Sequence, residues 1–120
     1  MMVKIVSKNF DIPLSHTLKV ARENGRYASL SKLFSMSPNE VIGEVEKSGL
    51  RGKGGGGAHT GEKWRLIPSP NEKPVYLVVN ADESEPGTFK DRQILEFDPH
   101  LLLEGIICSS YAIGAHHAYI

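Results

Sequence analysis

The pattern that most constrains the fold is a pair of strand-like segments separated by one long apolar helix. The first segment, VYLVVN at 75–80, is a nearly continuous apolar run, which predicts a strand buried on both faces of a parallel sheet. Residues 99–113 then carry an apolar helix pattern, with Asp98 as the N-cap candidate and Gly114 as the C-terminal stop. The stretch HHAYI at 116–120 predicts the second strand. Strand, helix and strand in this order predict an α/β fold with a right-handed crossover.

A second helix is predicted directly upstream of a glycine-rich stretch. Ser37 is the N-cap candidate, Pro38 falls at the first helical position, and Glu40 completes a capping box. Gly49 supplies the C-terminal stop of this helix. The helix therefore ends where the glycine-rich stretch begins.

The remainder of the N-terminal part is less clearly patterned. Within residues 1–36, an apolar stretch from Leu18 starts a helix that the Asn-Gly pair at 24–25 ends. We therefore predict an N-terminal helical segment over 1–48, followed by the α/β part over 49–120. At 120 residues, the chain has the usual size of one domain.

Composition excludes several classes of protein. The net charge of zero gives no global attraction to nucleic acid, and no apolar run reaches the roughly 20 residues of a membrane span. The single cysteine, Cys108, excludes an internal disulfide and any metal or iron–sulfur site built from cysteine pairs. It lies in an apolar run, where a thiol is expected to behave as a small hydrophobic side chain.

The stretch GLRGKGGGGAHTGEKW at 49–64 permits two interpretations. As a flexible linker, it would need only its glycine-rich composition. As an anion cradle, it would present backbone N–H groups that no Cβ obstructs, with Lys53 and Lys63 as flanking cations. The stretch matches neither the Walker nor the Rossmann glycine pattern, so composition alone leaves both interpretations open.

A polar loop, NADESEPGTFKDR at 80–92, directly follows the first predicted strand. Loops at the carboxyl ends of such strands are where α/β sheets bind ligands. The start of this loop gathers one amide and three acids, Asn80, Asp82, Glu83 and Glu85, and Asp91 near its end is a fourth acid. Such a loop can be simply solvated. Its amide and carboxylates also suit hydrogen bonds to the edge of a ring, a ribityl chain or a ribose, and they would disfavour an added 2′-phosphate.

These two loops and the segment DPHLLLEGIICSSYAIGAHHAYI together resemble one family, the flavin- and NADH-binding subunit of respiratory complex I. Related subunits occur in NAD-linked hydrogenases and formate dehydrogenases. The resemblance runs over about residues 37–120, and three motifs in the right order make it specific. It implies a Rossmann-like domain that holds FMN and NADH. Hydride would pass from NADH to FMN, and single electrons would then leave through iron–sulfur clusters.

The resemblance also implies roles for individual residues, and none of these is a metal ligand or a proton donor in catalysis. The residues expected at FMN are Gly52, Lys53, Gly54, Lys63, Asn80, Asp82 and Glu83. Those expected at NADH are Gly55, Gly56, Gly57 and Glu85, the last as a positioning group for the nucleotide. The implied partners are NADH, a thioredoxin-like [2Fe–2S] subunit and further subunits of a complex I-like assembly. The implied location is cytoplasmic and peripheral to the inner membrane, without insertion.

The sequence departs from the family at the NADH site. The family usually has GGAGFPTG where this chain has GGGGAHTG, so Ala58 and His59 replace an aromatic residue and a proline. A second aromatic residue is expected at Leu66, and the two rings would sandwich the adenine of NADH. Because a base–aromatic stack contributes about 1–3 kcal/mol, their absence predicts weaker NADH binding. We expect His59 to face solvent.

The second departure is length. The family's second flavin loop, its ubiquitin-like segment and its cysteine-rich cluster domain would all lie beyond residue 120, and one cysteine cannot hold a [4Fe–4S] cluster. We therefore expect a truncated portion of the Rossmann-like domain, which would bind FMN weakly by itself. Two alternatives are a non-catalytic remnant that docks to the [2Fe–2S] partner and a nucleotide-binding module without redox chemistry.

Overall fold

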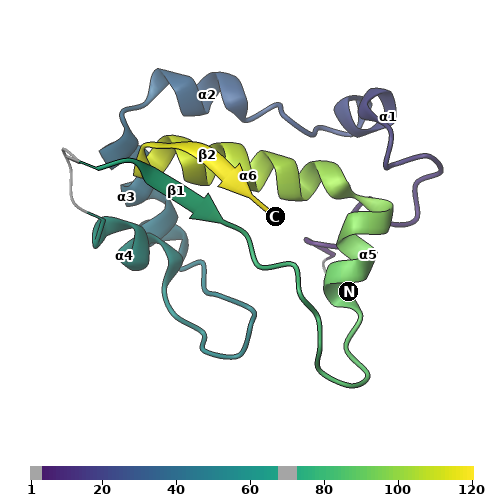
Figure 1. The fold of residues 1–120 in the computed structure, drawn as a ribbon. Coiled ribbons are helices and arrows are strands. Elements are labelled where there is room, and N and C mark those ends of the chain that lie inside the picture. Colours follow the sequence, from purple (N-terminus) through teal and green to yellow (C-terminus); the bar gives the residue numbers. More distant parts are fainter. Residues whose placement is uncertain (1–3, 68–72) are drawn as a thin grey trace.

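The structure is a computed structural model, and it describes residues 4–67 and 73–120. Along these residues, four helices precede the first strand and two helices separate the two strands, and Figure 1 shows their arrangement. The elements are α1 (Leu18–Glu23), α2 (Leu30–Ser35), α3 (Pro38–Ser48), α4 (Thr60–Arg65), β1 (Val75–Val78), α5 (Lys90–Phe97), α6 (Pro99–Ile113) and β2 (Ala115–Tyr119).

The two strands pair in parallel and α6 packs against both, which confirms the mixed α/β class. In Figure 1, α6 runs behind the strands and carries the chain back to the start of β2. The pairing contains one irregularity. Val75 pairs with Ala115 whereas Tyr76 pairs with His117, so His116 is an extra residue between the two partners.

The buried core lies between α6 and the helices of the N-terminal half. It is small because the strands contribute little to it. Its buried members come from α2, α3, the end of α6 and the start of β2, and they are Leu33, Val41, Ile42, Ala112, Ile113 and Ala115. Trp64 on α4, the last residue of the glycine-rich stretch at 49–64, also packs against this cluster.

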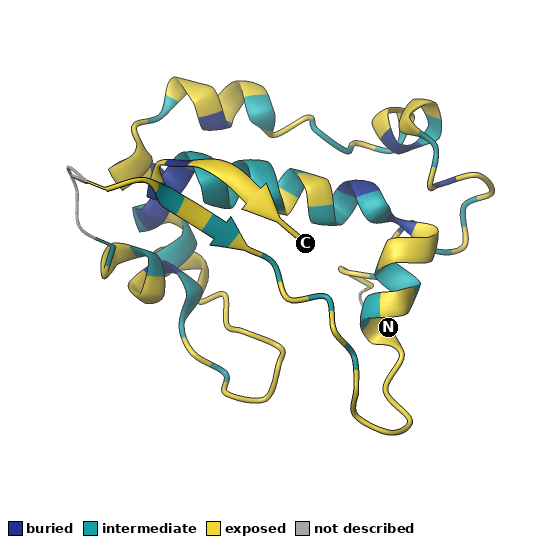
Figure 2. Cartoon of the chain, in the orientation of Figure 1, coloured by how far each residue is buried: buried dark blue, intermediate teal, exposed yellow. Residues whose placement is uncertain are grey.

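The prediction that the first strand is buried on both faces is wrong for the described residues. Val75 and Leu77 are half-buried and pack against the core, whereas Tyr76 is 53% and Val78 75% exposed. Figure 2 shows the same one-sided burial, with β2 exposed along most of its length. A short apolar run has no alternation that would reveal which of its side chains face the core, so the sequence could not separate the two cases.

The two helices with sequence caps form as predicted. Ser37 Oγ accepts from Glu40 N at 3.3 Å, and the Glu40 carboxylate accepts from Ser37 N at 2.7 Å, so the capping box is present. These hydrogen bonds from Ser37 lower the pKa of Glu40. Gly49 and Gly114 end their helices with left-handed φ of 66° and 70°. A side chain with a Cβ would be strained at either position.

Asp98 precedes α6 as predicted, but its side chain makes no capping hydrogen bond to that helix. Its carboxylate is buried and instead accepts three hydrogen bonds from the Arg26 guanidinium. The prediction of a side-chain N-cap at Asp98 is therefore wrong. A cation distant in sequence competes with the helix amides for the same oxygens, and a charge-assisted pair is the stronger interaction.

A second buried contact ties the N-terminal segment to the same end of α6. Tyr27 Oη lies 2.6 Å from Nδ1 of His100, and Nε2 of that ring lies 3.2 Å from the carbonyl oxygen of His16. Because a carbonyl only accepts, Nε2 donates to the His16 oxygen, and Nδ1 hydrogen-bonds with the tyrosine hydroxyl. Burial raises the pKa of Tyr27, and the carboxylates of Glu104 and Asp98 raise it further. The histidine is thus a satisfied structural residue.

Three short helices were not expected from the sequence. They are α2, α4 and α5, and each has eight residues or fewer. Only α1, which ends before the Asn-Gly pair at 24–25, agrees with a predicted short helix. Helices this short are stable through tertiary contacts, which leave little periodicity in the sequence.

Candidate functional site

The glycine-rich stretch forms a closed loop between α3 and α4. At its neck, Gly52 N donates to Ala58 O and Thr60 N donates to Leu50 O, both at 2.9 Å. Two backbone hydrogen bonds across the neck hold the two ends of the loop side by side. This geometry differs from that of a linker, which leaves its ends free to separate.

The helices that flank the loop also pack closely together. A Cβ on Gly61 in α4 would lie 2.6 Å from the backbone nitrogen of Glu46 in α3, so only glycine allows this approach. Arg65 forms a bidentate ion pair with the Glu46 carboxylate, at 2.7 and 2.6 Å. This hydrogen-bonded pair lowers the pKa of Glu46. Together with the neck, these contacts exclude the linker interpretation.

The tip of the loop has two features that a backbone anion cradle would use, namely amides without protein acceptors and glycines with positive φ. Within the described residues, no amide of residues 53–57 donates to a protein acceptor. Gly55 and Gly57 have left-handed φ of 101° and 61°, and a Cβ at either position would meet no atom within 4 Å. Exposed amides on a loop of this kind are suited to an anion.

Two lysines accompany these amides. Lys53 lies in the loop and Lys63 lies on α4, and neither forms an ion pair with any residue that the structure describes. Among the described residues, neither ammonium group is therefore neutralised by a carboxylate.

Sequence reasoning missed Arg51, which helps to shape the loop. Its Nη1 donates to the carbonyl oxygen of Gly57 at 3.1 Å, and its backbone pairs with His59 in an isolated antiparallel bridge. The predicted solvent-facing position of His59 is therefore only partly right, because this residue is half-buried at the neck. Its position as a basic residue directly before the glycine run could have indicated a role for Arg51 in this loop.

The polar loop after β1 is shaped by hydrogen bonds of its own. Asn80 Oδ1 accepts from Asp82 N at 2.8 Å, and Ser84 Oγ donates to the Asp82 carboxylate at 3.0 Å. A tight turn follows, in which Thr88 N donates to Glu85 O at 3.1 Å. Among the described residues, the carboxylates of Asp82 and Glu85 contact no cation. The amide nitrogen of Asn80 likewise remains available as a donor.

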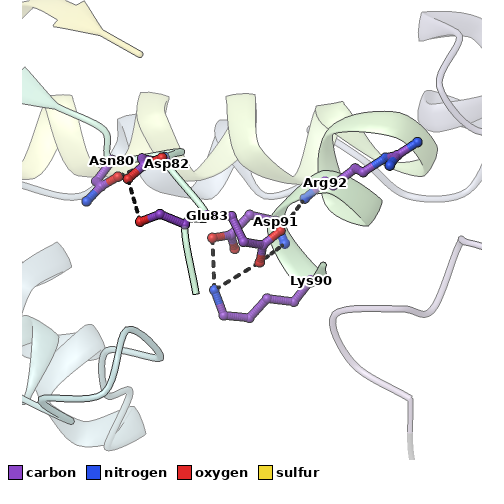
Figure 3. A network of polar contacts seen from close by, with 7 residues as sticks. Asn80, Asp82, Glu83, Lys90, Asp91 and Arg92 are labelled. Atoms are coloured by element: carbon purple, nitrogen blue, oxygen red, sulfur yellow. Dashed lines mark hydrogen bonds and ion pairs between the residues drawn. The ribbon is translucent and has the colours of Figure 1, made fainter. Parts of the chain in front are cut away.

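Glu83 behaves differently from the other acids of this loop, as Figure 3 shows. Its carboxylate accepts from the backbone amides of Asp91 and Arg92, at 2.9 and 3.1 Å, and lies 3.5 Å from Lys90 Nζ. Partial burial raises the pKa of Glu83, but these hydrogen bonds outweigh that effect and hold the pKa below its usual value. The sequence did not reveal this contact because it did not reveal α5.

The two loops lie on the same side of the molecule. In Figure 1 both extend below the carboxyl end of β1, the glycine loop from α3 and α4 and the polar loop toward α5. No hydrogen bond or ion pair joins one loop to the other within 4–67 and 73–120. That residues 52–57 open toward Asn80 and Asp82 around one ligand therefore remains a prediction.

The two positions where the family pattern expects aromatic residues are exposed to solvent. Ala58 is exposed at the loop neck, and Leu66 is exposed just after α4. The effect of these two residues on NADH binding also remains a prediction.

Metal-ligating side chains and the single cysteine were the other candidates for chemistry in this sequence. The described part of the chain contains no group of three or more His, Cys, Asp or Glu side chains placed to hold a metal ion. Cys108 packs against the core, and burial, followed by the negative charge of Glu104, raises the pKa of its thiol. None of the helices in these residues is long and apolar enough to cross a membrane.

Comparison with known proteins identifies the same region of the chain. Residues 45–120 match the family described as the Nuo51 FMN-binding domain. The chain is 56% identical over 108 residues to the NADH-quinone oxidoreductase F subunit of Aquifex aeolicus, and this alignment covers 90% of the chain. It is 53% identical over 106 residues to the corresponding protein of Rickettsia massiliae, covering 88% of the chain. A further relative, the second F subunit of Rhizobium meliloti, is 48% identical over 121 residues and covers the whole chain.

These relatives are much longer than the chain. The alignments cover 25% of the Aquifex aeolicus protein, 25% of the Rickettsia massiliae protein and 29% of the Rhizobium meliloti protein. The chain thus corresponds to about a quarter of the length of its relatives. The resemblance to the flavin- and NADH-binding subunit of complex I is confirmed over this portion.

Proposed function

Because the chain belongs to the Nuo51 FMN-binding domain family, we propose that it forms part of an FMN- and NADH-binding domain in an NADH dehydrogenase subunit. The observation that carries this proposal is the closed glycine loop. Among the described residues, the amides at its tip have no protein acceptor, and neither Lys53 in the loop nor Lys63 on α4 forms an ion pair. The loop extends on the same side of the molecule as the polar loop after β1. In this proposal residues 49–120 are the first part of a Rossmann-like domain, and residues 1–48 are a helical segment packed beside it.

The FMN would bind between the two loops. The phosphate carries negative charge, so its partners are the amides of Lys53 and Gly54 together with the ammonium groups of Lys53 and Lys63. Gly52, whose own amide donates to Ala58 O, would line the FMN at the loop neck without donating to it. Asn80 and Asp82 at the end of β1, with Glu83 in the same loop, lie on the flavin side of the site. Asn80 retains a donor and Asp82 retains an acceptor after their own contacts are counted, which fits a ligand with both donors and acceptors.

The nicotinamide nucleotide would approach the tip of the glycine loop. Gly55, Gly56 and Gly57 place no Cβ against its backbone, and the Glu85 carboxylate would accept hydrogen bonds from its ribose or amide. When bound, FMN supplies the redox chemistry, accepting hydride from NADH and releasing electrons singly to iron–sulfur clusters. The chain's own residues bind and orient the two nucleotides.

The surroundings follow from the same proposal. Relatives of the chain are named as subunits of an NADH-quinone oxidoreductase, so we place the protein in an assembly of this kind. Its proposed electron acceptor is a thioredoxin-like [2Fe–2S] subunit, and its proposed location is peripheral to the inner membrane on the cytoplasmic side. A [4Fe–4S] cluster would require cysteines other than Cys108.

The test is FMN binding by the full-length protein that contains this chain. The purified protein should show visible flavin absorbance. Replacing both Lys53 and Lys63 with methionine should raise the FMN dissociation constant by at least about 10-fold, since losing even one charge-assisted hydrogen bond costs about 1.5–3 kcal/mol. Lys47→Met is the matched control, because this lysine is 78% exposed on α3 and pairs with Glu44.

Three results would contradict the proposal. An FMN affinity that is unchanged in the Lys53 and Lys63 variant would remove the cradle from the site. A colourless protein that binds NADH would favour a nucleotide-binding module without redox chemistry, and a protein that binds neither would favour a non-catalytic role.

A further inference from the structure

We propose that Glu83 is a positioning residue that fastens the polar loop to α5 and so sets where Asn80 and Asp82 stand relative to the glycine loop. The inference deepens the proposed function and rests on it. It assigns to Glu83 a role in shaping the FMN site, in place of direct contact with the flavin.

The contacts of Glu83 use both of its oxygens. One oxygen accepts from Asp91 N at 2.9 Å and faces Lys90 Nζ at 3.5 Å, and the other accepts from Arg92 N at 3.1 Å. The side chain is only 10% exposed, whereas the Lys90 side chain beside it is 50% exposed. A carboxylate with this many donors and so little exposure has little capacity left for a ligand.

The backbone amides of Asp91 and Arg92, which donate hydrogen bonds to Glu83, need an acceptor from outside the helix. The first amides of a helix have no carbonyl partner within it, and the residue before α5, Phe89, provides no side-chain cap. Glu83, several residues upstream, supplies the missing acceptor. The loop between Glu83 and Lys90 is thereby closed on the first turn of α5.

The contact between Glu83 and α5 also restrains the position of the proposed site. The helix α5 packs on α6, and α6 packs on both strands, so Glu83 connects the loop to the core at its far end. The near end of the loop is fixed by β1 itself. Asn80 and Asp82 lie between these two anchors. Among the described residues, the Asn80 side chain accepts a hydrogen bond only from the Asp82 amide, and the Asp82 side chain accepts one only from the Ser84 hydroxyl. Loosening the Glu83 anchor should therefore displace both side chains without removing either.

The experiment uses Glu83→Ala and Glu83→Gln in the full-length, FMN-loaded protein. Glu96→Gln is the matched control, because it removes an α5 carboxylate that faces Arg92 at 3.8 Å and accepts no backbone amide among the described residues. Three quantities are measured: hydrogen exchange at the Asp91 and Arg92 amides, the FMN dissociation constant, and the reduction potential of the bound flavin.

In Glu83→Ala, exchange at both amides should accelerate by roughly fivefold, the typical effect of losing a capping acceptor. The FMN dissociation constant should rise by about tenfold or more, because misplaced binding groups weaken a site strongly. Glu83→Gln keeps one acceptor oxygen and should fall between wild type and alanine for both quantities. Any shift in flavin potential should appear only together with accelerated exchange at these two amides, and the control should show neither change.

Direct flavin contact predicts a different pattern. A shifted flavin potential in Glu83→Gln, with unchanged exchange at Asp91 and Arg92, would overturn the positioning role. Accelerated exchange with unchanged FMN affinity would also overturn it, since Glu83 would then cap α5 only. A wild-type protein without FMN would overturn the proposed function and the positioning role together, and the exchange rates would still decide whether Glu83 holds the loop on α5.

Discussion

Replacing Arg26 with methionine tests the ion pair that joins the N-terminal segment to the start of α6. The Asp98 side chain is fully buried and that of Arg26 is 14% exposed. Arg26 Nε lies 3.1 Å from each Asp98 oxygen, and Nη2 lies 2.5 Å from Oδ2. Methionine retains the apolar stem but leaves a buried carboxylate without a cation. Removing one partner of a buried pair costs about 3–5 kcal/mol, a large share of the roughly 5–15 kcal/mol that stabilises a typical domain.

The reciprocal change, Asp98→Asn, should be milder. The Arg26 guanidinium also lies 4.0 Å from a carboxylate oxygen of Glu104, so it keeps an anionic neighbour after this substitution. We expect a loss of about 1.5–3 kcal/mol, the range for a hydrogen bond to a charged group. The double variant should be more stable than Arg26→Met alone, because it leaves no buried charge unpaired.

Urea denaturation of the three variants, followed by circular dichroism and by the fluorescence of Trp64, measures these differences. This tryptophan packs against the core and so reports its loss. If Arg26→Met lowers the free energy of unfolding by less than about 1 kcal/mol, the ion pair contributes no more than a solvent-exposed pair, and the burial argument is refuted. A double variant no more stable than Arg26→Met would refute the claim that the unpaired charge is the source of the loss.

Other contacts lead to three further predictions. Gly61→Ala should destabilise the protein by roughly 1–3 kcal/mol in a thermal melt, because its Cβ would meet the backbone of Glu46 at 2.6 Å. The lowered pKa of Glu83 stabilises the fold above the usual glutamate range, and this contribution is lost as pH falls through the lowered value, so Glu83→Gln should flatten the acid side of a plot of melting temperature against pH. Cys108, whose thiol pKa is raised by burial and then by Glu104, should react with iodoacetamide more slowly in the folded than in the urea-unfolded protein.

The parts of the fold that the sequence predicts well are those with local signals. Ser37, Glu40 and Gly49 mark the ends of α3 through interactions within a few residues of each other, and these form as expected. The order of β1, α6 and β2 is also local information, since one apolar helix between two strand segments allows few other arrangements.

The parts that the sequence does not predict depend on partners distant along the chain. Asp98 has the residue type and position of an N-cap, and its actual partner, Arg26, lies 72 residues earlier. The short helix α5 has no side-chain N-cap at Phe89, and its first amides are satisfied by Glu83, which precedes the helix by several residues. In both cases an acid that is typical of a helix start acts through a contact that spacing alone cannot indicate.

The same limit decides how much of the candidate site could be predicted. The glycine loop and the polar loop were both identified as ligand-binding candidates, because residue type is enough to recognise amides without a Cβ and a cluster of acids. The acids of the polar loop are equivalent in the sequence, but they are not equivalent in the structure. Asp82 and Glu85 contact no cation among the described residues, whereas Glu83 is occupied by two backbone amides and Lys90. A carboxylate that already has its donors contributes to a site by holding its neighbours in place, so the acids left available, Asp82 and Glu85, are the ones to test first for nucleotide contact.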